Sequence, residues 1–179
     1  MRKNEKAMAI DWILIAIAGR VLYIGGMGLM LHFESKNHKS AMRLGYDKAF
    51  VRFRRFARSL MLLDVLCLFL LPIATAKTIP ISTPVAVSGG LILIFIGLGT
   101  KLWASKTLGN DGFYFRDMCV PPEKQRIVLD RGISGPYRYL KNPMYGIGNL
   151  HIIGWAIFYR SFAGIFVGIA SIGILYLFY

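Results

Sequence analysis

Five apolar runs separated by basic segments constrain this chain more than any other feature of its sequence. The runs lie at about residues 10–33, 60–76, 85–103, 144–158 and 162–179. A helix needs roughly twenty apolar residues to cross the hydrocarbon core of a membrane. The charged residues, 17% of the chain, are gathered between the runs, whereas a soluble domain intersperses them over its surface. We therefore predict one all-α integral membrane domain, residues 1–179, with four to five transmembrane helices.

The last two runs predict a helical hairpin. Only a short turn at Arg160 and Ser161 separates them. The first arm, residues 144–158, is short for a membrane crossing and needs tilt or local thinning of the bilayer.

The distribution of Lys and Arg predicts the orientation of the chain. The segments at residues 34–59 and 104–141 carry eight and seven of these residues, and the opposite side carries five, namely Arg2, Lys3, Lys6, Lys77 and Arg160. Cytoplasmic segments carry the excess of Lys and Arg. We predict that the N-terminus faces outward and that both basic segments and the C-terminus are cytoplasmic.

The net charge of +13 raises the question of a nucleic-acid partner. The basic residues flank the apolar runs as cytoplasmic loop charges do, so we predict none. The basic, aromatic segment Phe50–Phe56 instead suits a helix lying on anionic lipid of the inner leaflet. His32 and His38 have no Cys or acidic cluster at metal-ligand spacing nearby, so we predict no metal.

Two charged residues lie inside apolar runs, where an ionisable group indicates a functional site or a buried partner. Arg20 lies roughly 20 Å and Asp64 about 6 Å from the cytoplasmic ends of their runs, at 1.5 Å per residue. Pairing therefore needs a displaced or broken first helix, and snorkelling of Arg20 to the interface is the alternative. We interpret His151, in the fourth run, as a packed or hydrogen-bonded residue rather than a base.

The stretch Gly-Pro-Tyr-Arg-Tyr-Leu-Lys-Asn-Pro-Met-Tyr, from Gly135 to Tyr145, joins the second basic segment to the fourth run. It combines aromatic rings, fixed cations and a helix-breaking proline at a membrane surface. Anchoring alone needs only a few Lys or Arg residues and a Trp or Tyr. The stretch therefore predicts a site that holds a charged small molecule next to lipid.

This stretch, with Gly148 and Gly154-Trp155-Ala156 after it, resembles the signature of small membrane methyltransferases. These comprise the phospholipid (phosphatidylethanolamine) N-methyltransferases and the isoprenylcysteine carboxyl methyltransferases. Asn-Pro-Met-Tyr and the Arg160-Ser161 turn are closer to the phospholipid branch, while the Gly-Pro-Tyr-Arg-Tyr lead-in is shared with bacterial relatives of the other branch. Gly97-Leu98-Gly99 resembles a glycine pair assigned to S-adenosylmethionine binding.

The resemblance implies a pocket for S-adenosylmethionine at the cytoplasmic face. The predicted cofactor-binding residues are Gly97, Gly99, Tyr137, Arg138, Tyr139, Lys141, Asn142, Pro143, Tyr145 and Gly148. An Arg or Lys could pair with the cofactor carboxylate, and tyrosine rings could stack on adenine or face the sulfonium. Pro143 suits the first turn of the following helix, with Asn142 near its N-cap.

The acceptor predicted by the resemblance is a membrane lipid or a lipidated molecule. A phosphatidylethanolamine-type amine must first lose a proton to a base or in a desolvating pocket, whereas the carboxylate of an isoprenylcysteine needs no base. The candidate bases are Asp111, Asp117, Glu123 and Asp130, each of which could also be a solvated loop charge. The alternatives are a sterol-reductase-like protein, which needs more helices than this chain offers, and a non-catalytic protein of the same fold.

The end of the chain departs from the pattern of these families. An acidic Glu-Glu pair follows their last apolar run and contributes to cofactor binding, whereas this sequence stops at Tyr179. We expect that the chain is truncated or that another carboxylate substitutes.

Overall fold

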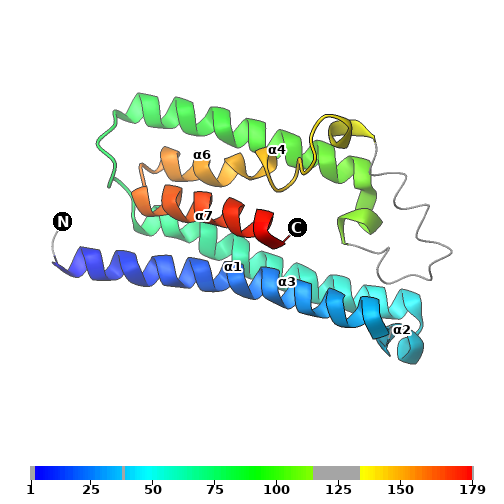
Figure 1. The fold of residues 1–179 in the computed structure, drawn as a ribbon. Coiled ribbons are helices and arrows are strands. Elements are labelled where there is room, and N and C mark those ends of the chain that lie inside the picture. Colours follow the sequence, from blue (N-terminus) through cyan, green and yellow to red (C-terminus); the bar gives the residue numbers. More distant parts are fainter. Residues whose placement is uncertain (1–2, 38, 115–133, 179) are drawn as a thin grey trace.

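The computed structural model describes residues 3–37, 39–114 and 134–178, and it is helical (Figure 1). The helices are α1 (Lys3–Asn37), α2 (Lys39–Leu44), α3 (Tyr46–Ala74), α4 (Thr83–Phe113), α6 (Leu150–Phe158) and α7 (Phe162–Phe178), with short 3-10 turns η3 (Gly135–Arg138) and η4 (Ile147–Asn149). No strand occurs in these three ranges. The predicted all-α fold is confirmed.

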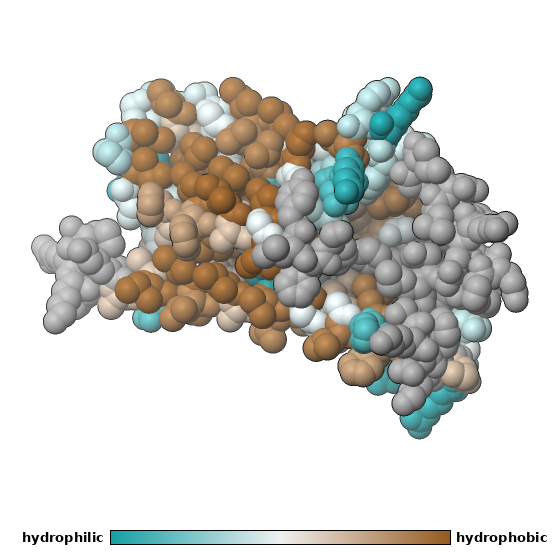
Figure 2. Space-filling model, viewed as in Figure 1, coloured by the Kyte–Doolittle hydropathy of each residue, from teal (hydrophilic) through white to brown (hydrophobic). Residues whose placement is uncertain are grey.

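Three of the described helices are long and apolar enough to cross a membrane. They are α1 over Ala7–Glu34, α3 over its full length and α4 over Thr83–Gly109. The apolar helices of the last two runs, α6 and α7, are shorter. On the face shown in Figure 2, apolar side chains cover the middle of the molecule, and hydrophilic ones gather toward the end at which α2 lies. These features confirm the predicted membrane protein.

The turn between α3 and α4 and the turn between α6 and α7 lie together at one end of the molecule (Figure 1). The amides of Lys77 and Thr78 donate to the carbonyl oxygens of Tyr159 and Arg160 at 3.0 and 2.9 Å. Arg160 takes a positive φ of 56°, which closes the tight turn of the predicted hairpin. The short α6 therefore reaches the same end as the long helices.

The second membrane helix begins well before the apolar run that predicted it. Gly45, with a φ of 81°, separates α2 from α3, and α3 then continues through the basic segment into the run. Phe50, Phe53 and Ala57 are buried in a cluster with Met27 and Leu31 of α1. The segment Phe50–Phe56 is therefore the beginning of α3 and packs on α1 through one face, and its contact with anionic lipid stays a prediction.

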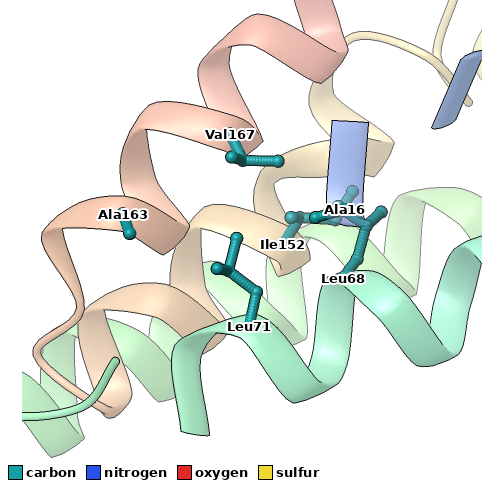
Figure 3. Close-up of a cluster of buried hydrophobic side chains, with 6 residues drawn as sticks. All are labelled: Ala16, Leu68, Leu71, Ile152, Ala163 and Val167. Carbon is teal, nitrogen blue, oxygen red and sulfur yellow. The ribbon is translucent and has the colours of Figure 1, made fainter. Parts of the chain in front are cut away.

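Four helices meet in the largest apolar cluster (Figure 3). The indole Nε1 of Trp155 adds a hydrogen bond of 3.1 Å to the carbonyl oxygen of Phe69. This cluster holds the final hairpin against the first helical pair. Its buried residues are Ala16 of α1, Leu68 and Leu71 of α3, Ile152 of α6, and Ala163 and Val167 of α7.

Glycines allow α4 and α6 to cross with their backbones in contact. A Cβ atom on Gly154 would lie 2.7 Å from the Gly90 carbonyl oxygen, and one on Gly90 would lie 2.8 Å from that of Gly154. Further along α4, a Cβ atom on Gly97 would overlap the backbone nitrogen of His151. Small residues let membrane helices approach closely. Because of this contact, Lys101 of α4 lies next to Gly148, just before the start of α6.

Candidate functional site

A cavity of about 290 Å³ lies inside the bundle, between α1, α3, α4 and the beginning of α6. This volume is close to the lower end of small-molecule sites, roughly 300–1,000 Å³. The cavity combines charges with flat apolar surfaces. The charged and imidazole groups on its wall belong to Arg20, Asp64, Lys101 and His151, and its aromatic rings belong to Tyr23, Phe69, Phe113, Tyr114 and Tyr145.

Arg20 and Asp64 form an ion pair on the cavity wall. Arg20 Nη1 lies 3.1 Å from Asp64 Oδ2, and the two residues are only 4% and 3% exposed. The sequence predicted that Arg20 and Asp64 lie at different depths, and this was wrong. The depth of Asp64 was counted from the start of the apolar run, whereas α3 already begins at Tyr46. With helices of this length, both residues lie at the same level without a break in α1.

Each member of this pair keeps one polar atom that the pair does not use. Arg20 Nε and Asp64 Oδ1 are buried, and neither has a hydrogen-bond partner among the residues that the structure describes. Buried polar atoms are nearly always paired in native proteins, so such exceptions point to a strained or functional site. The ion pair thus presents one unused donor and one unused acceptor.

Lys101 brings a second cation to the cavity from α4. It lines the same cavity as Arg20 and Asp64. Its aliphatic stem passes Gly148, where an added Cβ atom would lie 3.0 Å from Lys101 Cγ. No ion pair or hydrogen bond of Lys101 occurs within the described ranges. Among the wall residues that the structure describes, two are basic and one is acidic, so their charged forms together carry a surplus positive charge.

His151 is held by the backbone at the start of α6. Its Nδ1 lies 2.6 Å from the carbonyl oxygen of Gly148, a residue three positions earlier. This contact agrees with the interpretation of His151 as a hydrogen-bonded, packed side chain, although the ring also lines the cavity. Asn149, which is 1% exposed, similarly donates from Nδ2 to the Tyr145 carbonyl oxygen at 2.9 Å.

The structure brings part of the predicted motif to the cavity. Tyr145 lines it together with its neighbour Met144, and Gly148 makes room for the Lys101 stem. Pro143 is fully buried, and its carbonyl oxygen accepts a hydrogen bond of 2.8 Å from the Gly148 amide. These residues form the turn that positions Tyr145 beside the charges of α1, α3 and α4.

The predicted helix start at Pro143 was wrong. The chain turns through residues 141–146, η4 follows, and α6 begins at Leu150 with Asn149 as its N-cap. Gly146 and Gly148 carry little intrinsic helix preference, and the Gly148 amide bonds to a carbonyl five residues back. Asn142, half-buried, is therefore part of the turn and not a cap of α6.

The side chains of η3 and of the residues that follow it, up to Lys141, do not line the cavity. Pro136 is buried and Tyr137 is half-buried, while Arg138, Tyr139 and Lys141 are exposed. Burial raises the pKa of Tyr137 to about 12, so its phenol stays neutral at any ordinary pH. The three exposed side chains can meet a ligand only from outside the cavity.

The two glycines of the predicted triplet have different surroundings. Gly97 is buried in the crossing with α6, whereas Gly99 is exposed and an added Cβ atom there would have nothing within 4 Å. Neither glycine lines the cavity, although Leu98 between them does. Gly97 is thus a packing residue in this structure.

The predicted bases fall largely outside the described residues. Asp117, Glu123 and Asp130 lie in the undescribed range 115–133. Asp111 belongs to the last turns of α4, beyond a break at Gly109 with a φ of 67°, and its side chain is also outside the description. That break places Phe113 and Tyr114 on the cavity wall.

Five polar or charged residues of the cavity were not predicted from the sequence, namely Tyr23, Lys101, Ser105, Tyr114 and Asn149. A signal existed for Lys101, which is an isolated charge at the end of the third apolar run. No comparable signal marked the others, because their place on the cavity wall depends on how the helices pack and, for Tyr114 and Asn149, on the break in α4 and the turn before α6.

The comparisons with known proteins give one match. The sequence model of a family described as phospholipid methyltransferase matches residues 85–179, which include α4, the motif and the final hairpin. No curated protein matches the chain. No solved structure matches it either.

Proposed function

Because the chain belongs to the phospholipid methyltransferase family, we propose that it transfers a methyl group from S-adenosylmethionine to a membrane-embedded acceptor. The proposed acceptor is a phospholipid headgroup amine of the phosphatidylethanolamine type. One observation carries the proposal: a cavity with charged and aromatic walls lies within a bundle of membrane-length helices, next to the family motif. The walls of this cavity offer charged groups to a lipid headgroup and flat rings to the methyl donor.

The residues on the cavity wall fit the chemistry of the cofactor. When bound, S-adenosylmethionine supplies a methyl group on a sulfonium, and its other parts are an adenine, a carboxylate and an ammonium. Phe113, Tyr114 and Tyr145 offer rings on which adenine can stack or that can face the sulfonium, and a desolvated cation on such a ring gains about 2 kcal/mol. We assign the cofactor to this aromatic side of the cavity.

Of the binding residues predicted from the sequence, Tyr145 is the one that we place against the cofactor. Gly148 and Pro143 support it through the turn before α6. The exposed cations Arg138 and Lys141 can contribute by pairing with the cofactor carboxylate from the rim. Gly97 contributes indirectly, by holding α4 against α6.

The rate acceleration proposed for this site comes from aligning the methyl donor with the acceptor. Methyl transfer is an in-line displacement, and well-oriented reactants reach effective molarities of roughly 10⁵ M or more. The close crossing of α4 on α6 and the ion pair between α1 and α3 fix the cavity walls from four helices. An amine acceptor must also give up a proton to solvent or to a base before it reacts, and burial between helices makes this easier because it lowers the pKa of an ammonium group.

The experiment is incubation of the purified full chain with radiolabelled S-adenosylmethionine and phospholipid vesicles. We expect label in phosphatidylethanolamine, as its N-methylated product, and saturable binding of S-adenosylhomocysteine. Label in an isoprenylcysteine compound added to a parallel reaction would instead identify the carboxylate-type alternative. Binding of a reduced nicotinamide without methyl transfer would favour the reductase-like alternative, and the absence of any binding would favour a non-catalytic protein.

A further inference from the structure

We infer that Arg20, Asp64 and Lys101 form the subsite that binds the acceptor headgroup, and that this subsite recognises a zwitterion with an amine and a phosphate. The inference rests on the proposed function and deepens it by assigning the residues that select the acceptor. Two of the three residues come from α1 and α3, outside the region matched by the family. The first two membrane-length helices would then select the substrate and not only support the fold.

The cavity wall has one basic residue, Lys101, in addition to the ion pair of Arg20 and Asp64. Arg20 and Asp64 neutralise one another at 3.1 Å, which is sufficient for two charges inside a bundle. Lys101 adds a cation at the same wall and has no partner of its own in the described ranges. The charged form of Lys101 is costly inside a membrane bundle, and a bound anionic group would offset that cost.

The two atoms of the ion pair that lack hydrogen-bond partners indicate which chemical groups the ligand carries. Asp64 Oδ1 needs a donor and Arg20 Nε needs an acceptor, and both are buried. An amine or ammonium offers donors to the carboxylate, and a phosphate offers acceptors to Arg20 and Lys101. A phosphoethanolamine headgroup supplies both kinds of group within one short unit.

The unused oxygen of Asp64 also disfavours the carboxylate alternative. A carboxylate acceptor offers only acceptors, which Lys101 and Arg20 could meet. Asp64 Oδ1 would then stay unpaired and would face a second negative group in the cavity. An amine acceptor avoids this repulsion.

Apolar residues on the rim allow the acyl chains to remain in the membrane. Val65 of α3 and Leu98 and Leu102 of α4 line the cavity and are also 41%, 42% and 61% exposed. They lie on helices that pack mainly on other partners, α3 on α1 and α4 on α6. A lipid lying between α3 and α4 could place its headgroup at the charges while its chains stay outside.

The first test measures binding of glycerophosphoethanolamine by calorimetry to the full chain in phosphatidylcholine nanodiscs. We expect Lys101→Met to weaken binding by roughly tenfold or more, the loss of one charge-assisted hydrogen bond. Lys106→Met is the matched control, since Lys106 is exposed on the same helix and does not line the cavity. Equal effects of the two substitutions, or no effect of Lys101→Met, would overturn the subsite.

The second test concerns Asp64. Asp64→Asn alone leaves Arg20 buried and uncompensated and can prevent folding, so the double variant Arg20→Gln with Asp64→Asn is used because it keeps a neutral, hydrogen-bonded pair. The parent should prefer glycerophosphoethanolamine to glycerophosphoglycerol, and the double variant should bind both equally. Retention of the preference would contradict the role of Asp64.

Binding of S-adenosylhomocysteine separates the two proposals. It should be unchanged in Lys101→Met and in the double variant, and a parallel loss would place these residues at the cofactor instead. Charge-dependent headgroup binding without methyl transfer by the parent would sustain the subsite and reject the proposed function. Methyl transfer that is unaffected in all variants would sustain the function and reject the subsite.

Discussion

Gly97 and Gly99 are two residues apart and were predicted from a resemblance to serve the same ligand, yet their surroundings differ. A Cβ atom at Gly97 meets the backbone nitrogen of His151, whereas one at Gly99 meets nothing within 4 Å. Inserting a methyl group into a close-packed contact costs about 1–3 kcal/mol when neighbours must shift. We expect Gly97→Ala to lower the thermal unfolding midpoint in detergent by several degrees, measured by circular dichroism.

Gly99→Ala is the control for this substitution. It should leave the unfolding midpoint unchanged and can gain a little stability from the better helix preference of alanine. A Gly97→Ala protein as stable as the parent would show that the crossing of α4 and α6 is looser than described. A Gly99→Ala protein that is stable but binds S-adenosylhomocysteine poorly would support the cofactor role that the resemblance gave to this glycine.

The first half of α3 illustrates what hydropathy could and could not predict. The apolar part of the helix was found because its run is continuous. The start at Tyr46 was missed because several arginines interrupt the apolar residues there, although Phe50, Phe53 and Ala57 recur at helical intervals. The longer helix corrects the depth of Asp64 and accounts for its pairing with Arg20.

Phe53→Ala tests whether this basic beginning of α3 is packed. Phe53 is 2% exposed and contributes to the cluster with α1, and truncation of a buried Phe costs about 3–5 kcal/mol. We expect a marked fall in the thermal unfolding midpoint of the detergent-solubilised protein. Phe56→Ala, at a position 43% exposed on the same helix, should change it much less. Equal, small effects would mean that this segment lies on lipid rather than on α1.

The cavity depends on the whole bundle, and this explains why only part of it could be predicted. Tyr145 was predicted because its neighbours resemble a family signature. Arg20 and Asp64 were indicated because they are charged residues inside apolar runs. Their meeting with Lys101 requires the lengths of α1 and α3, the glycine crossing of α4 on α6 and the turn before α6. None of these relations is local in sequence, so periodicity and motifs do not contain them.

The arrangement of the helices makes the orientation of the chain testable. The turns at residues 75–82 and 159–161 share one end, and α2 and the end of α4, which belong to the two basic segments, lie toward the other (Figure 1). We expect the basic end to be cytoplasmic, because Lys and Arg are retained on that side during insertion. Ser82 and Lys106, exposed near opposite ends of α4, are suitable positions for single cysteines after Cys67 and Cys119 are replaced by serine.

A membrane-impermeant maleimide should label Lys106→Cys only in inverted vesicles and Ser82→Cys only in vesicles of native orientation. Disruption of the vesicles with detergent should expose both positions and serves as the control for reactivity. Labelling of both cysteines from one side would contradict the span assigned to α4, and the reverse pattern would place the basic end outside. In that reverse case the cofactor proposal would also weaken, because S-adenosylmethionine is a cytoplasmic metabolite and the cavity reaches Tyr114 near the basic end of α4.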